Sequence, residues 1–446
     1  MLLLQIRYQD GFVAWLNGVE VARRHLPAGA TVATALGSQE AERVLIDLPP
    51  GLLQPNSVLA VEVWPAKGRT SSVELALDGS DAVQLLRGPY LQRLALDDSD
   101  EGWIVIDTDV PTQATLRYGI TGAPAGEGPP LRAITDGKTA THHVLHLSKL
   151  QPGIAYRYRL TASANGSQPV EVEAAFHTPP AAGHPLRFVV LGDVRTGHEV
   201  HAQIARAVIA EDPDLVLLTG DLVEQGDDDT EWQRFFDVAA PILRQVAVYP
   251  APGNHDYALH NRGRERFLNF FIRTRATPWW SFDVARVHFA CVDSMAYGDP
   301  EQRLWLERDL AAARQRGARA IFVYDHDGPW SSQMHGDNRD AVATYAPLYE
   351  RYRATVFSGH DHDYERGRVG NVDYFVSGGG GAELRIPRCG IAGRPRCSAR
   401  VRGFANEHHY LVVEVLADRV KVCPKRPDGT PLEPCSLLKL PPATSH

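Results

Sequence analysis

The sequence FSGHDHDYER, residues 357–366, places two histidines on alternate positions directly after the apolar run TVF. Side chains two residues apart on an extended segment point to the same face, so His360 and His362 are expected to aim their imidazoles at one place. Two neutral imidazole nitrogens are typical ligands of a divalent or trivalent metal ion. Taken alone, the pair fits a metal site, a buried histidine pair or a solvated turn.

Four further segments carry the polar groups that a metal centre would need, and each follows or closes a short apolar run. They are LGDVRTG (191–197), LTGDLVEQG (218–226), PGNHDY (252–257) and VYDHDGPW (323–330). Buried parallel strands have this apolar character, and ligands bind beyond the carboxyl ends of strands in an open α/β sheet. We therefore expect six polar side chains to converge on one rim. They are Asp193, Asp221, Asn254, His326, His360 and His362.

The ordered set GD, GD, GNHD, VxxH and GHxH resembles the metallophosphoesterase, or calcineurin-like, superfamily. The resemblance implies two metal ions bridged by the carboxylate of Asp221, whose charge between two cations offsets their repulsion. It assigns one ion to Asp193, Asp221 and His362, and the other to Asp221, Asn254, His326 and His360. It also implies an α/β/β/α four-layer sandwich, which agrees with the alternation of strand and helix patterns after Leu186.

The chemistry implied by this resemblance is hydrolysis of a phosphate ester. Two metal ions about 3.5 to 4 Å apart hold phosphate oxygens and lower the pKa of a bound water, giving a hydroxide placed for in-line attack. We expect an acid-phosphatase-like enzyme acting on monoesters, with diesters as the alternative. His255, next to Asn254, is placed to stabilise the transition state or protonate the leaving oxygen. Iron, manganese and zinc all suit Asp, Asn and His ligands.

Two positions depart from the superfamily pattern. Many relatives have a ligand histidine at the place of Arg195, and purple acid phosphatases have, at the place of Glu224, a tyrosine whose bond to ferric iron gives the colour. The remaining ligand of the first ion is open among water, Glu224, His198 and His201. We expect water, with Arg195 binding the substrate phosphate as a bidentate donor or, alternatively, holding a structural ion pair. A metal-loaded protein without this tyrosine should show no intense visible tyrosinate band.

The first 181 residues have the alternating pattern of β-strands between turn sequences. RGPYLQ, PTQATLRYG and LQPGIAYRYRL resemble the fibronectin-III-like domain that precedes the catalytic domain of purple acid phosphatases. The segment before it, residues 1–87, resembles a truncated jelly-roll or galactose-binding-like accessory module. Such a module would either bind a glycan or have a purely structural role. We predict a multidomain chain of two all-β sandwich modules, residues 1–87 and 88–181, followed by a metallophosphoesterase domain, residues 182–446.

Cysteine spacing bears on the compartment. Cys389 and Cys397, and likewise Cys423 and Cys435, flank short irregular segments with a spacing unlike that of a zinc site, so we predict two disulfides and a secreted or periplasmic protein. Cys291, in the apolar run HFACVDS, is expected to be a buried thiol. An export signal is absent from the start of this chain, and we expect its N-terminus to be truncated.

Composition excludes some functions. The net charge of −8 over 446 residues argues against a nucleic-acid partner, and without an apolar run of about 18 residues no membrane span is expected. Two other functions stay open: an extracellular carbohydrate-binding or adhesion protein with a vestigial phosphatase centre, and a nucleic-acid or nucleotide phosphodiesterase. The complete ligand set speaks against the first, and the acidic charge against the second.

One helix is predicted with a defined face. LWLERDLAAARQR, residues 304–316, has an amphipathic pattern, and we expect Leu304, Leu306, Leu310 and Ala311 on its buried side.

Overall fold

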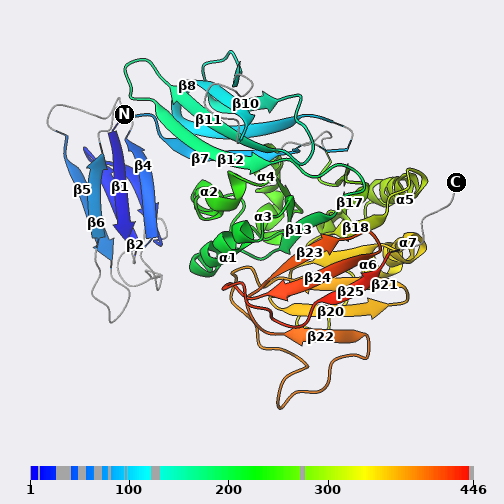
Figure 1. Ribbon diagram of the computed structural model, residues 1–446. Helices are drawn as coiled ribbons and strands as arrows, with labels where there is room; N and C mark the ends of the chain where they lie inside the picture. The colour runs from blue at the N-terminus through cyan, green and yellow to red at the C-terminus, as the bar shows by residue number, and fades with distance from the viewer. Residues whose placement is uncertain are drawn as a thin grey trace. The chain divides into compact units, whose positions relative to one another are not determined.

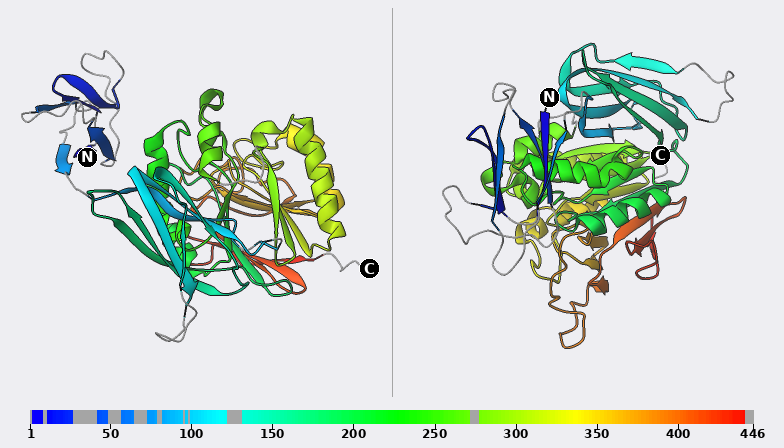
Figure 2. Two further views of the ribbon diagram at one scale, coloured as in Figure 1. Left: turned by 90° about the horizontal axis from the view of Figure 1, so that it is seen from above. Right: turned by 90° about the vertical axis from the view of Figure 1, so that its left-hand side faces the viewer.

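The chain divides into two compact units in the computed structural model (Figures 1 and 2). One unit contains Met1–Val83 and Ser163–Val170, and the other contains Gln84–Ala162 and Glu171–His446. The structure describes residues 2–8, 11–26, 42–48, 57–64, 73–78, 82–94, 96–97, 99–121, 131–271 and 277–440.

The first unit contains two three-stranded antiparallel sheets. Their strand orders are β4(Glu42–Leu48)-β1(Leu2–Tyr8)-β6(Val73–Asp78) and β3(Val19–Arg24)-β2(Gly11–Leu16)-β5(Leu59–Trp64). Every second residue of β1 and β2 enters one hydrophobic cluster, because alternate side chains of a strand point to the same face. The cluster contains Leu4, Ile6, Tyr8, Phe12, Ala14 and Leu16. Asn17 and Gly18, with φ of 52° and 84°, form the tight turn between β2 and β3.

A six-stranded sheet begins the second unit. Its strands are β7(Leu85–Gln92), β8(Gly102–Ile120), β9(Arg132–Thr135), β10(Ala140–Leu147), β11(Ala155–Ser163) and β12(Val170–His177). Two side chains of β7 hold this sheet against the end of α4(Arg264–Phe270): Tyr90 Oη and Gln92 Nε2 donate to Phe270 O at 2.9 and 2.7 Å. Tyr90 also joins the hydrophobic core of the following α/β region, so the two parts share one core.

Two further sheets pack face to face in the α/β region. One has the order β15(Val248–Pro250)-β14(Leu215–Leu218)-β13(Leu186–Leu191)-β23(Tyr410–Val415)-β24(Arg419–Lys425)-β25(Ser436–Lys439). The other has the order β16(Trp280–Val284)-β17(Val287–Cys291)-β18(Ala320–Tyr324)-β19(Thr355–Ser358)-β21(Val372–Ser377)-β20(Tyr364–Val369)-β22(Val401–Ala405). The ring of Phe188 on β13 lies 5.1 Å from that of Phe322 on β18, between ring centroids. Strands β13, β14 and β15 are parallel to one another, as are β17, β18, β19 and β21.

Helices cover the outer faces of both sheets (Figure 1). Helices α1(His198–Ala210) and α2(Asp229–Leu243) share a core with Val189 and Leu191 of β13, whereas Phe188 of the same strand faces the other sheet. The second sheet packs on α5(Pro300–Gln315), α6(Arg339–Thr344) and α7(Ala346–Tyr352). The short helices are α3(Asn254–Tyr257), η2(Leu259–Asn261) and η3(Ser294–Ala296). The predicted order helix, sheet, sheet, helix is thus present in this region.

The predicted buried face of α5 was partly wrong. Leu306 and Leu310 are fully buried as expected, and Ala313 completes the face, but Leu304 is 45% exposed. Residues two apart on an α-helix lie about 200° apart around its axis, so Leu304 and Leu306 cannot share one face.

The cysteine predictions are confirmed. Cys389 pairs with Cys397 and Cys423 with Cys435, and Cys291 is a buried thiol outside these disulfides. Among the described residues, no helix has the length and apolar character needed to cross a membrane.

A buried histidine ties α5 to the edge of the second sheet and should make stability depend on pH. His288 Nδ1 and Nε2 lie 2.8 Å from Asp283 Oδ1 and Asp309 Oδ2. Burial alone would lower the pKa of His288, but hydrogen bonds to the two carboxylates outweigh burial and raise it. A raised histidine pKa stabilises the fold fully below the unfolded value of about 6.5 and loses this effect as pH rises through the folded value.

We therefore expect His288→Gln to cost up to about 3 kcal/mol at pH 6, and clearly less at pH 9, because it removes the cation shared by two partly buried carboxylates and leaves Asp283, among the described residues, paired only with Arg316. Denaturant unfolding at the two pH values measures the difference. His184→Gln, which changes an exposed histidine, serves as the control. An equal loss at both pH values would contradict the charged pairing.

Candidate metal centre

The six predicted ligands all lie beyond the carboxyl ends of parallel strands. The loops after β13 and β14 carry Asp193 and Asp221, the helix α3 that follows β15 begins with Asn254, and the loops after β18 and β19 carry His326, His360 and His362. The first three strands belong to one sheet and the last two to the other. The rim at which the two sheets meet therefore collects all six side chains.

The backbone turns sharply at three of these positions. Asp193, Asp221 and His360 have φ of 55°, 54° and 69°, in the left-handed region that a residue with a Cβ atom enters at a cost of about 1 kcal/mol or more. Gly253 and Gly359 are required by close approach, because a methyl group at either position would overlap a carboxylate oxygen, of Asp221 or Asp193 respectively. The left-handed turns and the two glycines, which have no side chain, together allow the polar groups to lie close to one another.

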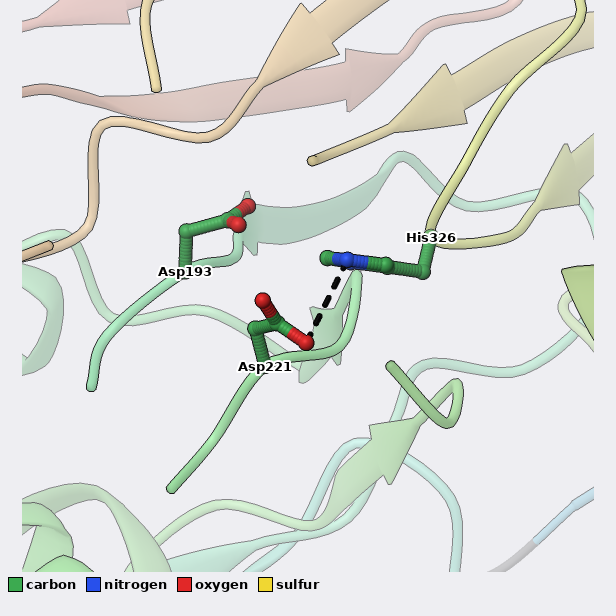
Figure 3. Close-up of side chains that lie close together, drawn as sticks. All are labelled: Asp193, Asp221 and His326. Carbon is green, nitrogen blue, oxygen red and sulfur yellow. Dashed lines mark ion pairs between the residues drawn. The ribbon is translucent and has the colours of Figure 1, made fainter. Parts of the chain in front are cut away.

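One half of the centre surrounds the Nε2 atom of His326. Asn254 Oδ1 and His360 Nδ1 lie 3.1 Å from it, and Asp221 Oδ1 lies 3.3 Å from it. Figure 3 shows the side chains of Asp221 and His326 facing each other, with Asp193 beside them. One ligand atom each from Asp193, Asp221 and His326 can be chosen so that all three lie within 4.8 Å of one another.

The hydrogen bonds of His326 define which nitrogen faces the centre with a lone pair. Its Nδ1 lies 2.9 Å from the carbonyl oxygen of Thr219, which can only accept, so Nδ1 carries the proton and Nε2 presents a lone pair. In this tautomer the lone pair faces oxygens of Asp221 and Asn254 in a buried space, so the arrangement needs either a metal ion or a second proton on Nε2. Burial lowers the pKa of His326, but the nearby carboxylates, Asp221 foremost, outweigh it and raise the pKa to about 10. These residues therefore fit a metal ion.

The other half of the centre has the same donor character. His362 Nδ1 donates to the carbonyl oxygen of Glu383 at 2.6 Å, which turns the Nε2 lone pair toward Asp193 Oδ1, 3.4 Å away. Asp193 Oδ2 accepts from the backbone N–H of His360 at 3.0 Å. Asp193 Oδ1 is buried, and within the described chain no hydrogen-bond donor reaches it. A buried carboxylate oxygen without a donor is suited to a cation.

Arg195 also lies at this half. Its side chain is 9% exposed, and the guanidinium donates from Nε to Asp221 Oδ2 at 3.2 Å, from Nη1 to Glu224, and from Nη2 to His362 Nε2 at 3.4 Å. A guanidinium has five N–H groups, so these three contacts leave two for another partner. Arg195 therefore competes for the lone pairs of Asp221 and His362 with any metal ion held at this half of the centre.

The predicted catalytic residue His255 borders Asp221. Its backbone N–H donates to Asp221 Oδ1 at 3.0 Å, and its Nδ1 lies 2.8 Å from the carbonyl oxygen of Glu224, which fixes the ring. Its Nε2 is directed toward the centre, 4.0 Å from Asp221 Oδ2. The imidazole remains partly exposed, with a quarter of its side-chain surface accessible, as a group that meets a substrate must be.

Sequence reasoning missed Asp256, a buried carboxylate that joins two of the ligand loops. Its oxygens accept from the backbone N–H groups of Gly253, Asp221 and Leu222 at 2.8 to 3.0 Å and of Val223 at 3.3 Å. Burial raises the pKa of Asp256, and the charge of Asp221 adds to this, to about 7. The signal available in the sequence was the aspartate of the GNHD motif. An aspartate in a tight, glycine-containing turn can accept hydrogen bonds from backbone N–H groups that have no other partner.

His198 and His201, which were considered as extra ligands, have other neighbours. His201 is buried and its ring stacks on that of Phe235 at 6.0 Å between centroids, and His198 Nε2 lies 3.4 Å from Arg234 Nη1. The ring of His335 stacks instead on that of the predicted ligand His360, with 3.7 Å between centroids.

Residues 186–364 match the family model of the calcineurin-like phosphoesterases, and the chain therefore contains a calcineurin-like phosphoesterase domain. No curated protein matches the chain at a significant level.

Solved structures with the same fold include purple acid phosphatase PPD1 from yellow lupin (Lupinus luteus) seeds, which is 15% identical with a TM-score of 0.72, over 97% of this chain and 90% of that one. PhoD is 12% identical with a TM-score of 0.56, over 81% of this chain and 90% of its own. GAP50, the anchor in the inner membrane complex of Plasmodium, is 15% identical with a TM-score of 0.50, over 58% and 90%. The domain match and this fold support a metal-dependent phosphoesterase.

Proposed function

We propose that the protein hydrolyses phosphate monoesters, and diesters in second place, at a centre of two metal ions. The six ligands would be Asp193, Asp221, Asn254, His326, His360 and His362, with Asp221 shared between the ions. The observation that carries this proposal is the set of lone-pair atoms within 3.3 Å of His326 Nε2. Bound metal ions would supply Lewis-acid polarisation of the phosphoryl group and acidify a water molecule, and iron, manganese and zinc all suit these ligands.

The residues around the centre would bind and orient the ester. Arg195 has two N–H groups beyond its present three contacts, which allow it to bind a phosphate oxygen while it stays paired. His255 would donate a proton from Nε2 to the leaving oxygen or stabilise the transition state, because its Nδ1 is held by the carbonyl of Glu224.

The modules before the catalytic domain belong to the same proposal. We propose sandwich modules at residues 1–87 and 88–181, the second fibronectin-III-like and the first an accessory module able to bind a glycan, ahead of a catalytic domain at residues 182–446. The two disulfides favour an oxidising compartment, so we propose a secreted or periplasmic protein.

Metal analysis of the purified full chain, combined with mono- and diester substrates, tests this function. We expect close to two metal ions per chain, hydrolysis of monoesters, loss of activity on chelation, and recovery when iron, manganese or zinc is returned. Bound metal with hydrolysis of neither ester would instead favour a binding protein with a vestigial centre.

The position of Arg195 predicts that the two metal ions bind unequally. The guanidinium donates to Asp221 and His362, so an ion at that half must share these lone pairs with a positive charge. We expect Arg195→Ala to tighten the weaker ion about tenfold or more, since two like charges about 4 Å apart repel by several kcal/mol in a protein. Calorimetric titration of metal into the stripped protein measures this.

Arg187→Ala is the matched control, because Arg187 pairs with Glu414 on the sheet. Equal affinity of both ions in the unmodified protein, unchanged in Arg195→Ala, would contradict this role of the guanidinium.

A further inference from the structure

An open pocket of about 900 Å3 lies beside the candidate metal centre. Two of its lining residues contact the loop that carries the predicted ligand His360. The ring of His335 stacks on His360 with 3.7 Å between centroids, and Ser331 Oγ donates to the carboxylate of Asp361. A group attached to a phosphate at the centre could therefore extend into this pocket.

One wall of the pocket is held in place by covalent and hydrogen bonds. The disulfide between Cys389 and Cys397 closes this wall, and the backbone N–H of Arg388 donates to Gln333 Oε1 at 2.9 Å. Gln333 Nε2 in turn lies 3.2 Å from Cys389 Sγ. Gly390 N donates to the carbonyl of Pro395 at 2.9 Å across the same loop. The arginines on this wall are therefore presented by an anchored loop.

The pocket carries an excess of positive charge. Its lining includes Arg339, Arg388, Arg396 and Arg400, and one carboxylate, Asp337. Arg400 Nη1 donates to Asp337 Oδ2 at 2.6 Å, so this pair is neutral overall. In the described part of the chain, no carboxylate pairs with the guanidinium of Arg339, Arg388 or Arg396. Three positive charges thus remain in a molecule whose net charge is −8.

We propose that the substrate is a phosphate ester whose leaving group carries a second phosphate, and that Arg339, Arg388 and Arg396 bind this second phosphate. The inference rests on the proposed function and adds the substrate class. A phosphate carries close to two negative charges, and its oxygens match the paired N–H groups of a guanidinium. Three arginines without carboxylate partners therefore suit a phosphate better than they suit a ligand with a single carboxylate. The volume also leaves room for a sugar or nucleoside between the two phosphates.

A matched pair of esters tests the inference. We expect the metal-loaded full chain to hydrolyse fructose 1,6-bisphosphate with a kcat/KM about tenfold or more above that for fructose 6-phosphate, since charge-assisted hydrogen bonds to one phosphate are worth at least this factor. The double variant Arg388→Gln, Arg396→Gln should lose most of this preference, and each single variant part of it. Arg402→Gln, an exposed arginine lining a different pocket, should keep the full preference.

The outcomes separate this inference from the proposed function. Hydrolysis of both esters with equal kcat/KM, or a preference that the double variant keeps, would overturn the inference and leave the phosphoesterase proposal standing. If neither these esters nor the other mono- and diesters are hydrolysed, the phosphoesterase proposal fails, and calorimetric binding of the two fructose phosphates decides the inference alone. Tighter binding of the bisphosphate that is lost in the double variant supports it, and equal binding refutes it. Metal content and thermal unfolding confirm that each variant is folded.

Discussion

Asp221→Asn is expected to reduce hydrolysis on the order of a thousandfold and to release metal from the protein. One oxygen of Asp221 lies 3.3 Å from His326 Nε2, and the other accepts from Arg195. An amide keeps the shape but removes the charge that both halves of the centre share. Losing several kcal/mol of transition-state stabilisation corresponds to about three factors of ten in rate.

Metal content and the rate of phosphate release, measured on the same preparation, test this prediction. Asp418→Asn is the control, because Asp418 lies in the exposed turn between β23 and β24 and pairs with its neighbour Arg419. Full metal content and an unchanged rate in Asp221→Asn would show that this carboxylate does not bridge the ions.

Asp256→Ala is expected to have the largest effect on stability. The carboxylate of Asp256 accepts four buried backbone N–H groups, three of them from the loop that contains Asp221. Each buried donor left without a partner costs about 1 to 3 kcal/mol, so we expect a loss of about 4 kcal/mol or more together with weaker metal binding. Denaturant unfolding and metal analysis measure the two effects.

Two further variants keep this prediction testable if the alanine variant does not fold. Asp256→Asn keeps one acceptor oxygen and should lose less stability. Asp228→Ala removes the capping carboxylate of α2, which accepts from Thr230 N at 2.7 Å at an exposed helix end and should cost about 1 kcal/mol. A loss in Asp256→Ala no greater than that in Asp228→Ala would contradict the role of Asp256.

The convergence of polar side chains at the site could be anticipated because each apolar run ends directly before a polar motif. Parallel strands place such ends on one edge, so the meeting of Asp193 and Asp221 after β13 and β14 followed from local pattern alone. The face of α5 did not follow, because apolar residues occur on more than one side of that helix and only packing decides between them. Leu304 remained exposed for this reason.

The contacts between residues of the site were harder to anticipate than which residues form it. Arg195 and Glu224 are on different loops, and their ion pair depends on how the ends of β13 and β14 turn. Asp256 was visible in the GNHD motif, but its partners are backbone N–H groups, which carry no sequence signature. Side-chain chemistry can therefore be predicted from motifs, whereas the hydrogen bonds that hold the loops require coordinates.

The left-handed backbone at Asp193, Asp221 and His360 has a consequence for protein design. The direction of each of these side chains is determined by the path of the main chain around it, which ordinary strands and helices do not follow. Placing the six side chains alone on another scaffold would therefore not reproduce the arrangement of the candidate metal centre. Transferring the complete loops, including their glycines, should reproduce it.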